Sequence, residues 1–301
     1  MSDYKREVEK LKVAVIYGGP SPEAEISKRS ARSVMKALRE LGHEVYPVEL
    51  SPELPFRLKE ISPDRAFLVL HGSPGEDGTV QGLLEVMGIP YTGCGVISSA
   101  VSIDKDLTKR VLSSHGIPVP AGITLFRGDD FEPAEVPCVV KPARAGSSVG
   151  VTLVKTPEEF KSAVERAFTY DSKVLVEEYL PGKELTVAVV NARALPPVEI
   201  VLGREFYDYQ AKYSDPSTRY VVPAPVSSFL ERRLREIASK VYRVLECRGA
   251  VRVDFRLNQY GSPFVLEVNT IPGLTERSLL PKSAAAEGIS FRQLIQEMLD
   301  S

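Results

Sequence analysis

The chain has little of what a disulfide-stabilised or membrane-spanning protein needs. Its 301 residues include only three cysteines, Cys94, Cys138 and Cys247, which is an odd number at wide spacing. These form neither a disulfide framework nor a zinc-binding spacing, so we expect a reducing compartment. No apolar stretch reaches the roughly 18 residues of a membrane span, and the apolar run after the charged N-terminus is too short for a signal peptide. We therefore expect a cytoplasmic protein.

The chain also has almost no net charge. Lys and Arg total 38 and Asp and Glu total 40, a balance of −2. This excludes a basic field over the whole chain, so we expect no nucleic-acid partner. Because no apolar stretch is long enough to span a membrane, we expect no membrane partner either. A hydrophobic share of 43% and a charged share of 26% are typical of a globular protein and exclude disorder. The length suggests about two domains, with three small ones as the alternative.

Short apolar runs alternate with helical patterns over the first hundred residues. We expect strands at 13–17, 44–50 and 66–70, and a helix at 22–41 with Ser21 as its N-cap. This alternation predicts a parallel sheet with right-handed crossovers. Ligands of such sheets bind beyond the carboxyl ends of the strands, where Gly18 and His71 fall.

The remainder has the pattern of α+β structure. In the middle section, strands are expected at 136–141, 151–154, 174–179 and 184–190, and helices at 104–114 and 156–168. In the last section, we expect a strand at 197–202, helices at 229–245 and 291–299, and a hairpin of 250–257 with 263–268. Gly261 supplies the turn of that hairpin.

A small-residue loop, Lys141–Gly150, joins two of the expected strands. Small residues let backbone N–H groups approach a phosphate, and Lys141 can add a point charge. Neither a Walker sequence nor GxGxxG is present, so this would be a phosphate cradle of another kind. A solvated hairpin loop is the alternative.

Polar side chains interrupt the two apolar strands of the expected hairpin. Arg252 and Asp254 lie two apart, as do Glu267 and Asn269, so each pair shares a strand face. Pairing of the strands would bring Asp254, Glu267 and Asn269 together, and such oxygen ligands suit Mg²⁺. Arg252 would stand beside them and could meet an anion. Solvent-facing polar residues are the alternative, which the apolar surroundings weaken because buried carboxylates need partners.

Two further segments also contain candidate binding residues. After the Glu267 strand, a Pro-Gly turn at Gly273 can aim a backbone N–H into the site, and Ser278 either binds a carboxylate or only caps a helix. The polar segment 203–220 contains Tyr207-Asp-Tyr-Gln-Ala-Lys-Tyr213. It is either a surface loop or a lid that excludes water from a reactive intermediate.

Taken together, these stretches resemble the D-alanine–D-alanine ligases of the ATP-grasp superfamily. The resemblance covers residues 13–299 and rests on GGPSPEAEISKRS, LHGSPGEDGTVQG, PYTGCGVISSAVSIDK, KPARAGSSVG, YDYQAKY, VRVDF and LEVNTIPGLTERSLLP. It implies an α/β and α+β ATP-grasp fold of three domains. These are an N-terminal parallel-sheet (Rossmann-like) substrate-binding domain at 1–102, a central ATP-grasp domain at 103–190, and a C-terminal ATP-grasp domain at 191–301 with the lid and the Mg²⁺ site.

The resemblance also implies a reaction. ATP phosphorylates the carboxylate of one D-alanine, the amine of a second D-alanine attacks the acyl phosphate, and the tetrahedral intermediate collapses to dipeptide, ADP and phosphate. The dipeptide feeds peptidoglycan synthesis. Two Mg²⁺ ions are implied, with Mn²⁺ as a substitute and a monovalent cation as a further activator. The family also implies a homodimer.

Roles follow at the positions that match the family's motifs. The implied ATP-binding residues are Lys105, Lys141, Ser148, Glu177, Glu178, Leu180, Glu184 and Lys212, with 177–180 reading adenine and Glu184 the ribose. The implied metal ligands are Asp254, Glu267 and Asn269. The implied catalytic groups are the triad Glu23, Ser147 and Tyr213, and the oxyanion-stabilising Arg252 and Gly273. The implied substrate-binding residues are His71, Ser278 and Leu279.

Two alternatives stay open. One is a sister ligase that takes D-serine or D-lactate as its second substrate. D-Lactate ligases of the family lack the lid tyrosine motif and typically carry a histidine, so Tyr213 favours an amine nucleophile. The other is a nucleotide-binding module without chemistry. That module would lack Arg252 or part of the metal set, and all are present.

Overall fold

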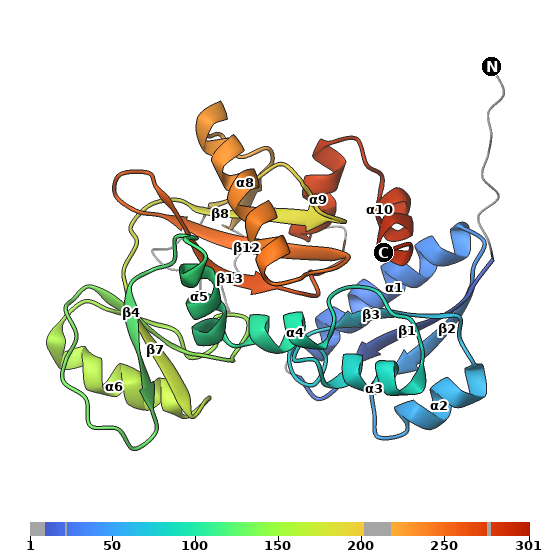
Figure 1. Ribbon diagram of the computed structural model, residues 1–301, viewed down its shortest axis with the longest axis horizontal. Helices are drawn as coiled ribbons and strands as arrows, with labels where there is room; N and C mark the ends of the chain where they lie inside the picture. The colour runs from blue at the N-terminus through green and yellow to red at the C-terminus, as the bar shows by residue number, and fades with distance from the viewer. Residues whose placement is uncertain (1–9, 22, 202–217, 276–277) are drawn as a thin grey trace.

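The computed structural model describes residues 10–21, 23–201, 218–275 and 278–301. These residues form three β-sheets with helices packed on their faces (Figure 1). The N-terminal and central sheets lie on opposite sides of the molecule, and the C-terminal sheet lies above and between them in that view. None of the described helices is both long and apolar enough to cross a membrane.

The N-terminal sheet is parallel, as predicted. Its strands, in the order β2-β1-β3, are β1 (Lys12–Gly18), β2 (Glu44–Glu49) and β3 (Arg65–Leu70). Its helices are α1 (Ala24–Glu40), α2 (Leu54–Ile61) and α3 (Thr79–Met87). Val13 and Val15 pack with α1, whereas Ala14 and Ile16 pack with α2 and α3. The alternation of side chains along β1 therefore buries both sheet faces.

The first helix begins later than the sequence suggested. Glu23, not Ser21, is the N-cap residue of α1, and its side chain makes no capping hydrogen bond. The Ser21 hydroxyl instead accepts from the Glu23 N–H at 3.1 Å, and the Ser21 carbonyl accepts from the Ala24 N–H at 3.0 Å. Ser21 thus holds the turn that precedes the helix, and Glu23 lies at the helix tip.

The central sheet is antiparallel, in the order β4-β7-β5-β6. Its strands are β4 (Gly122–Phe126), β5 (Cys138–Pro142), β6 (Thr152–Val154) and β7 (Lys173–Glu178), and α6 (Pro157–Phe168) packs on one face. The edge strand β4 was not predicted. Leu125 is its single buried residue, so its sequence carries little of the apolar signal of a strand.

The C-terminal sheet has six strands, with a main path β11-β10-β8-β12-β13 and β9 paired to β8. The strands are β8 (Glu184–Val190), β9 (Arg193–Ala194), β10 (Val198–Val201), β11 (Arg219–Val221), β12 (Ala250–Leu257) and β13 (Pro263–Asn269). The β12–β13 hairpin was predicted. The grouping of β8 with the middle section was wrong, because β8 pairs with β10 and β12.

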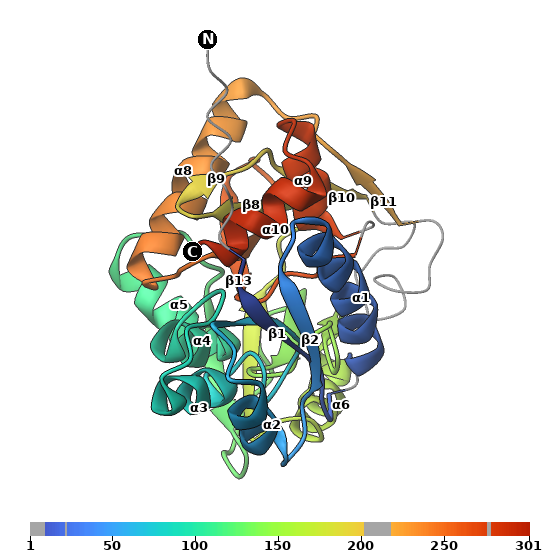
Figure 2. The same ribbon diagram turned by 90° about the vertical axis from the view of Figure 1, so that its right-hand side faces the viewer.

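Helices cover both faces of this sheet and join it to its neighbours. They are α4 (Val96–Ile103), α5 (Lys105–Ser114), α8 (Ser228–Val244), α9 (Leu279–Ala286) and α10 (Phe291–Leu299). One apolar cluster joins α8 to β8 and β12, and another joins α9 and α10 to α1. Figure 2 shows α10 beside α1. From sheet membership we propose one domain for each sheet, with the second boundary between β7 and β8.

Candidate active site

Two cavities meet where the three sheets converge. The larger, of about 640 Å³, is lined by residues from all three sheet regions, and the smaller, of about 110 Å³, lies between the central and C-terminal sheets. Lys105 and Glu267 line both. Seven of the eight predicted ATP-binding residues line the smaller cavity: Lys105, Lys141, Ser148, Glu177, Glu178, Leu180 and Glu184. The eighth, Lys212, lies outside the described residues.

The hairpin brings the predicted metal ligands together. Asp254 lies directly across the ladder from Glu267, and Arg252 across from Asn269, with an irregularity in register just after Asp254. The Asn269 amide donates to Asp254 Oδ2 at 3.0 Å. Two carboxylates and an amide oxygen thus share one strand face, a donor set that fits Mg²⁺ completed by phosphate and water. Among the described residues, no three His, Cys, Asp or Glu side chains gather in a metal-binding group.

Asp254 is oriented by more partners than the sequence indicated. Arg252 donates two hydrogen bonds to it, from Nε to Oδ1 at 2.8 Å and from Nη2 to Oδ2 at 2.9 Å. Thr186, a fully buried residue of β8, donates its hydroxyl to Oδ1 at 2.5 Å. Arg252 was expected to face an anion, and the structure shows that it also holds this carboxylate in place. Thr186 was missed because its strand reads as ordinary apolar core.

A buried charge network lies at the wall of the smaller cavity. Glu177 of β7 forms ion pairs with two lysines. One carboxylate oxygen lies 2.8 Å from Lys141 Nζ, and the other pairs with Lys109. Burial alone would raise the pKa of Glu177, but the two lysines lower it. Burial lowers the pKa of Lys109 to about 7, although Glu177 opposes that shift. Lys109 was missed; its one signal is the spacing of four from Lys105, which places both lysines on one face of α5.

The lowered pKa of Lys109 predicts a pH dependence of stability. The unfolded lysine keeps a pKa near 10.5, so between about pH 7 and pH 8.5 the unfolded chain binds the proton that the folded chain releases. Stability from this group therefore rises with pH in that window, by about 1–2 kcal/mol or about 2–4 °C in Tm. Melting curves at both pH values should show a smaller rise in Lys109→Met than in the wild type. Lys183→Met, which alters an exposed lysine, is the matched control, and equal rises in wild type and Lys109→Met would contradict the prediction.

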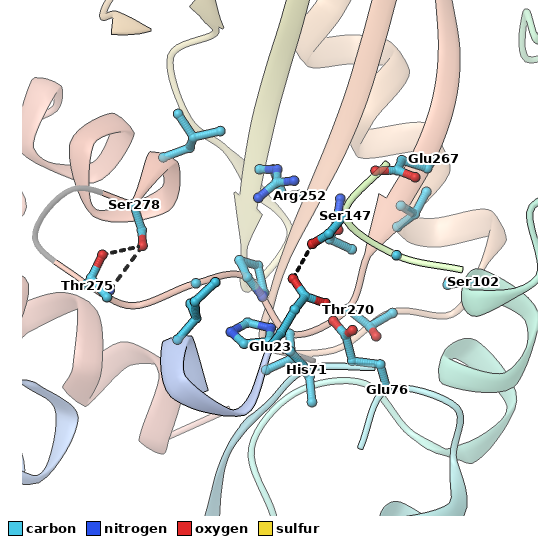
Figure 3. A pocket seen from close by; sticks show the side chains of 18 of the residues that line it. Glu23, His71, Glu76, Ser102, Ser147, Arg252, Glu267, Thr270, Thr275 and Ser278 are labelled. Carbon is cyan, nitrogen blue, oxygen red and sulfur yellow. Dashed lines mark hydrogen bonds between the residues drawn. The ribbon is translucent and has the colours of Figure 1, made fainter. Parts of the chain in front are cut away.

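The small-residue loop Lys141–Gly150 connects the smaller cavity to the tip of α1. Ser147 and Ser148 have positive φ angles of 51° and 58°, and Lys105 Nζ donates to the Ala145 carbonyl at 2.8 Å. The Ser147 hydroxyl donates to the Glu23 carboxylate at the tip of α1 (Figure 3). The first two members of the predicted triad are thus in contact. The third, Tyr213, lies outside the described residues.

The far end of the smaller cavity is held by an arginine that the sequence did not single out. Arg256 donates Nε to the Leu180 carbonyl at 2.9 Å and Nη1 to Glu184 at 2.9 Å. The Glu178 carboxylate accepts from the Ala121 N–H at 2.8 Å. These contacts fix the 178–184 segment, which was predicted to bind adenine and ribose.

The larger cavity holds the predicted substrate-binding residues. His71, Gly273, Ser278 and Leu279 all line it, as do Glu23 and Arg252. Gly273 lies close to Ser278, because a Cβ at this position would be 2.9 Å from Ser278 Oγ. Glu76, which was not predicted, also lines the cavity and accepts from the Gly72 N–H at 2.6 Å. Figure 3 shows its side chain among those that line the cavity.

Ser278 is the N-cap residue of α9 in backbone conformation, but its hydroxyl makes no capping hydrogen bond. It instead accepts from the Thr275 N–H at 3.1 Å and lies 2.8 Å from the Thr275 hydroxyl. The alternative that the Ser278 side chain caps the helix is therefore wrong, although the residue occupies the N-cap position. The first N–H groups of α9 point toward the cavity end of the helix, where an anion is favoured.

Comparisons with known proteins agree with this geometry. Two family descriptions match the chain: D-ala D-ala ligase N-terminus over residues 53–94 and D-ala D-ala ligase C-terminus over 111–300. The D-alanine--D-alanine ligase of Aquifex aeolicus is 46% identical over 288 residues, which are 95% of this chain and 98% of that protein.

Solved structures give the same result. The D-alanine--D-alanine ligase from Bacillus anthracis complexed with ATP aligns with a TM-score of 0.85 at 35% identity, covering 96% of each chain. The VanG D-Ala:D-Ser ligase from Enterococcus faecalis aligns with a TM-score of 0.84 at 32% identity, covering 97% of this chain and 99% of that one. The predicted ATP-grasp fold is confirmed. The chain belongs to the D-alanine–D-alanine ligase family.

Proposed function

We propose that the smaller cavity binds ATP, that the larger one binds two D-alanines, and that the chain joins them into D-alanyl-D-alanine for peptidoglycan synthesis. The enzyme is an ADP-forming ligase, as its family is. The observation that carries the proposal is that the two cavities meet at Lys105 and Glu267, beside the polar face of the β12–β13 hairpin. A carboxylate in the larger cavity can therefore reach a phosphate in the smaller one.

The nucleotide is held by charges and by the small-residue loop. Lys105 and Lys141 face the smaller cavity and supply positive charge for the phosphates. The left-handed backbone at Ser147 and Ser148 lets neighbouring N–H groups approach a phosphate. Glu184, which accepts a hydrogen bond from Arg256, would accept from the ribose hydroxyls.

The proposed metal site rests on the kinds of donor atom that three side chains offer. Asp254, Glu267 and Asn269 would hold Mg²⁺, with Mn²⁺ as a substitute. When bound, the metal neutralises charge on the phosphate oxygens and aligns the transferred phosphoryl group.

The chemistry then follows from the residues around the junction. The first D-alanine's carboxylate oxygen attacks the γ-phosphorus of ATP, and ADP leaves. Glu23 lines the larger cavity at the tip of α1 and would bind that substrate's ammonium. The second D-alanine's amine attacks the acyl carbon, and Arg252 with the Gly273 N–H stabilises the oxyanion that develops. Collapse of the intermediate releases phosphate and leaves the new amide.

Three further expectations stay predictions: the homodimer, the cytoplasmic location and activation by a monovalent cation. So do the lid roles of Lys212 and Tyr213, which lie outside the described residues.

Product analysis tests the proposed function. With ATP, Mg²⁺ and D-alanine alone, we expect dipeptide, ADP and phosphate in equal amounts, and we expect excess chelator to abolish all three. ATP turnover that is indifferent to D-alanine would contradict the assignment. Equal concentrations of D-alanine, D-serine and D-lactate, with products separated by mass, identify the preferred second substrate. A dominant D-alanyl-D-serine or D-alanyl-D-lactate product would replace the proposed acceptor.

A further inference from the structure

Two cations on the wall of the larger cavity, Arg29 of α1 and Lys282 of α9, have no part in the roles described so far. Lys282 lies in the first half of α9, four residues after Ser278, and both residues line the cavity. A separation of four residues places two side chains on the same face of a helix, one turn apart. Lys282 therefore lies one turn beyond Ser278 along the same cavity wall.

Among the described residues, the side chain of Lys282 contacts an aromatic ring and pairs with no carboxylate. Its side chain is half-buried, and Nζ lies 6.0 Å from the centroid of the Tyr220 ring, within reach of a cation–π interaction. In the parts of the chain that the structure describes, no carboxylate forms an ion pair with it. A half-buried cation without an acidic neighbour adds positive potential to the cavity that it lines.

If a carboxylate binds beside Ser278, a nearby positive charge would strengthen its binding, because the other groups there are uncharged. Ser278 offers a neutral hydroxyl that already makes hydrogen-bond contacts with Thr275. The hydroxyl and the N–H groups at the start of α9 can orient a carboxylate. A hydrogen bond from a charged donor is roughly twice as strong as a neutral one, and Lys282 is the cation on this helix that faces the cavity.

We propose that Lys282 binds the carboxylate of the acceptor D-alanine and makes the site prefer an acceptor that carries a free carboxylate. This inference rests on the proposed function. Lys282 acts on binding of the second substrate and not on phosphoryl transfer, because the residues that line the smaller cavity do not include it.

The test compares Lys282→Met with Lys282→Arg. Methionine keeps the length, the apolar stem and the helix propensity of the lysine, so α9 should fold and pack as before. From initial rates across a wide range of D-alanine concentration, we expect the KM of the second D-alanine to rise at least about tenfold in Lys282→Met. The KM values of ATP and of the first D-alanine should stay within twofold. Lys282→Arg keeps the charge and should stay within about threefold of the wild type.

A second readout separates binding of the carboxylate from a merely structural role. D-Alaninamide has an amine but no carboxylate, so it can act only as acceptor. With D-alanine and D-alaninamide at equal concentration, the ratio of dipeptide to dipeptide amide should fall at least about fivefold in Lys282→Met. Lys36→Met is the matched control, because Lys36 is an exposed lysine of α1 that lines neither cavity.

The outcomes are distinct. An unchanged second KM and an unchanged product ratio in Lys282→Met would overturn the role of Lys282 while leaving the ligase intact. A raised KM with an unchanged ratio would also overturn it, because only packing would then have changed. Absence of dipeptide from the wild-type enzyme would instead overturn the proposed function.

Discussion

Glu267→Gln should lower kcat by at least about a hundredfold, or about 2.7 kcal/mol of barrier. Glu267 lines both cavities, lies across the hairpin from Asp254, and is 3.5 Å from Lys105. Glutamine keeps the shape of the side chain but removes the negative charge with which Glu267 would hold a metal ion. Steady-state kinetics at saturating Mg²⁺, ATP and D-alanine measure the effect.

The matched control is Glu199→Gln. Glu199 is a carboxylate of the same sheet, paired with Lys183 at 2.9 Å, and it lines neither cavity. Its turnover should stay within about threefold of the wild type. If Glu267→Gln also stayed within about threefold, or about 0.7 kcal/mol, the metal role of Glu267 would be wrong.

Arg252→Met should lower kcat by about a thousandfold, or about 4 kcal/mol, and should also destabilise the fold. Arg252 faces the larger cavity and forks onto Asp254, which is 7% exposed. The variant removes an oxyanion donor and leaves a nearly buried carboxylate without its cation. Losing one partner of a buried ion pair costs about 3–5 kcal/mol, so Tm should fall by several degrees.

Arg252→Lys separates the two effects. Lysine keeps the positive charge but cannot make the bidentate contact with Asp254. We expect it to recover most of the Tm and only a small part of the kcat. A kcat within tenfold of the wild type in Arg252→Met, measured on folded protein, would contradict the oxyanion role.

The hairpin at the centre of the site could be predicted from local patterns. Alternating apolar residues fix which side chains share a face, Gly261 supplies the turn, and pairing then aligns Asp254 with Glu267. The N-terminal parallel sheet was predicted in the same way, from apolar strands that alternate with an amphipathic helix.

Other parts depend on contacts between distant segments. The sheet to which β8 belongs is decided by its pairing with β12, which lies some sixty residues later. Lys109 lies in a helical pattern like any other lysine, and it becomes part of the site because β7 brings Glu177 against it. Thr186 and Arg256 are likewise defined by their partners, Asp254 and Glu184. Local periodicity does not contain this information.

Transfer of labelled oxygen tests whether the ligation passes through an acyl phosphate. With D-alanine labelled by ¹⁸O at both carboxylate oxygens, an acyl phosphate route moves one labelled oxygen into phosphate for each dipeptide formed. We expect one ¹⁸O in the released phosphate and one in the new amide carbonyl, and we expect both to depend on Mg²⁺. Dipeptide formation with unlabelled phosphate would contradict it.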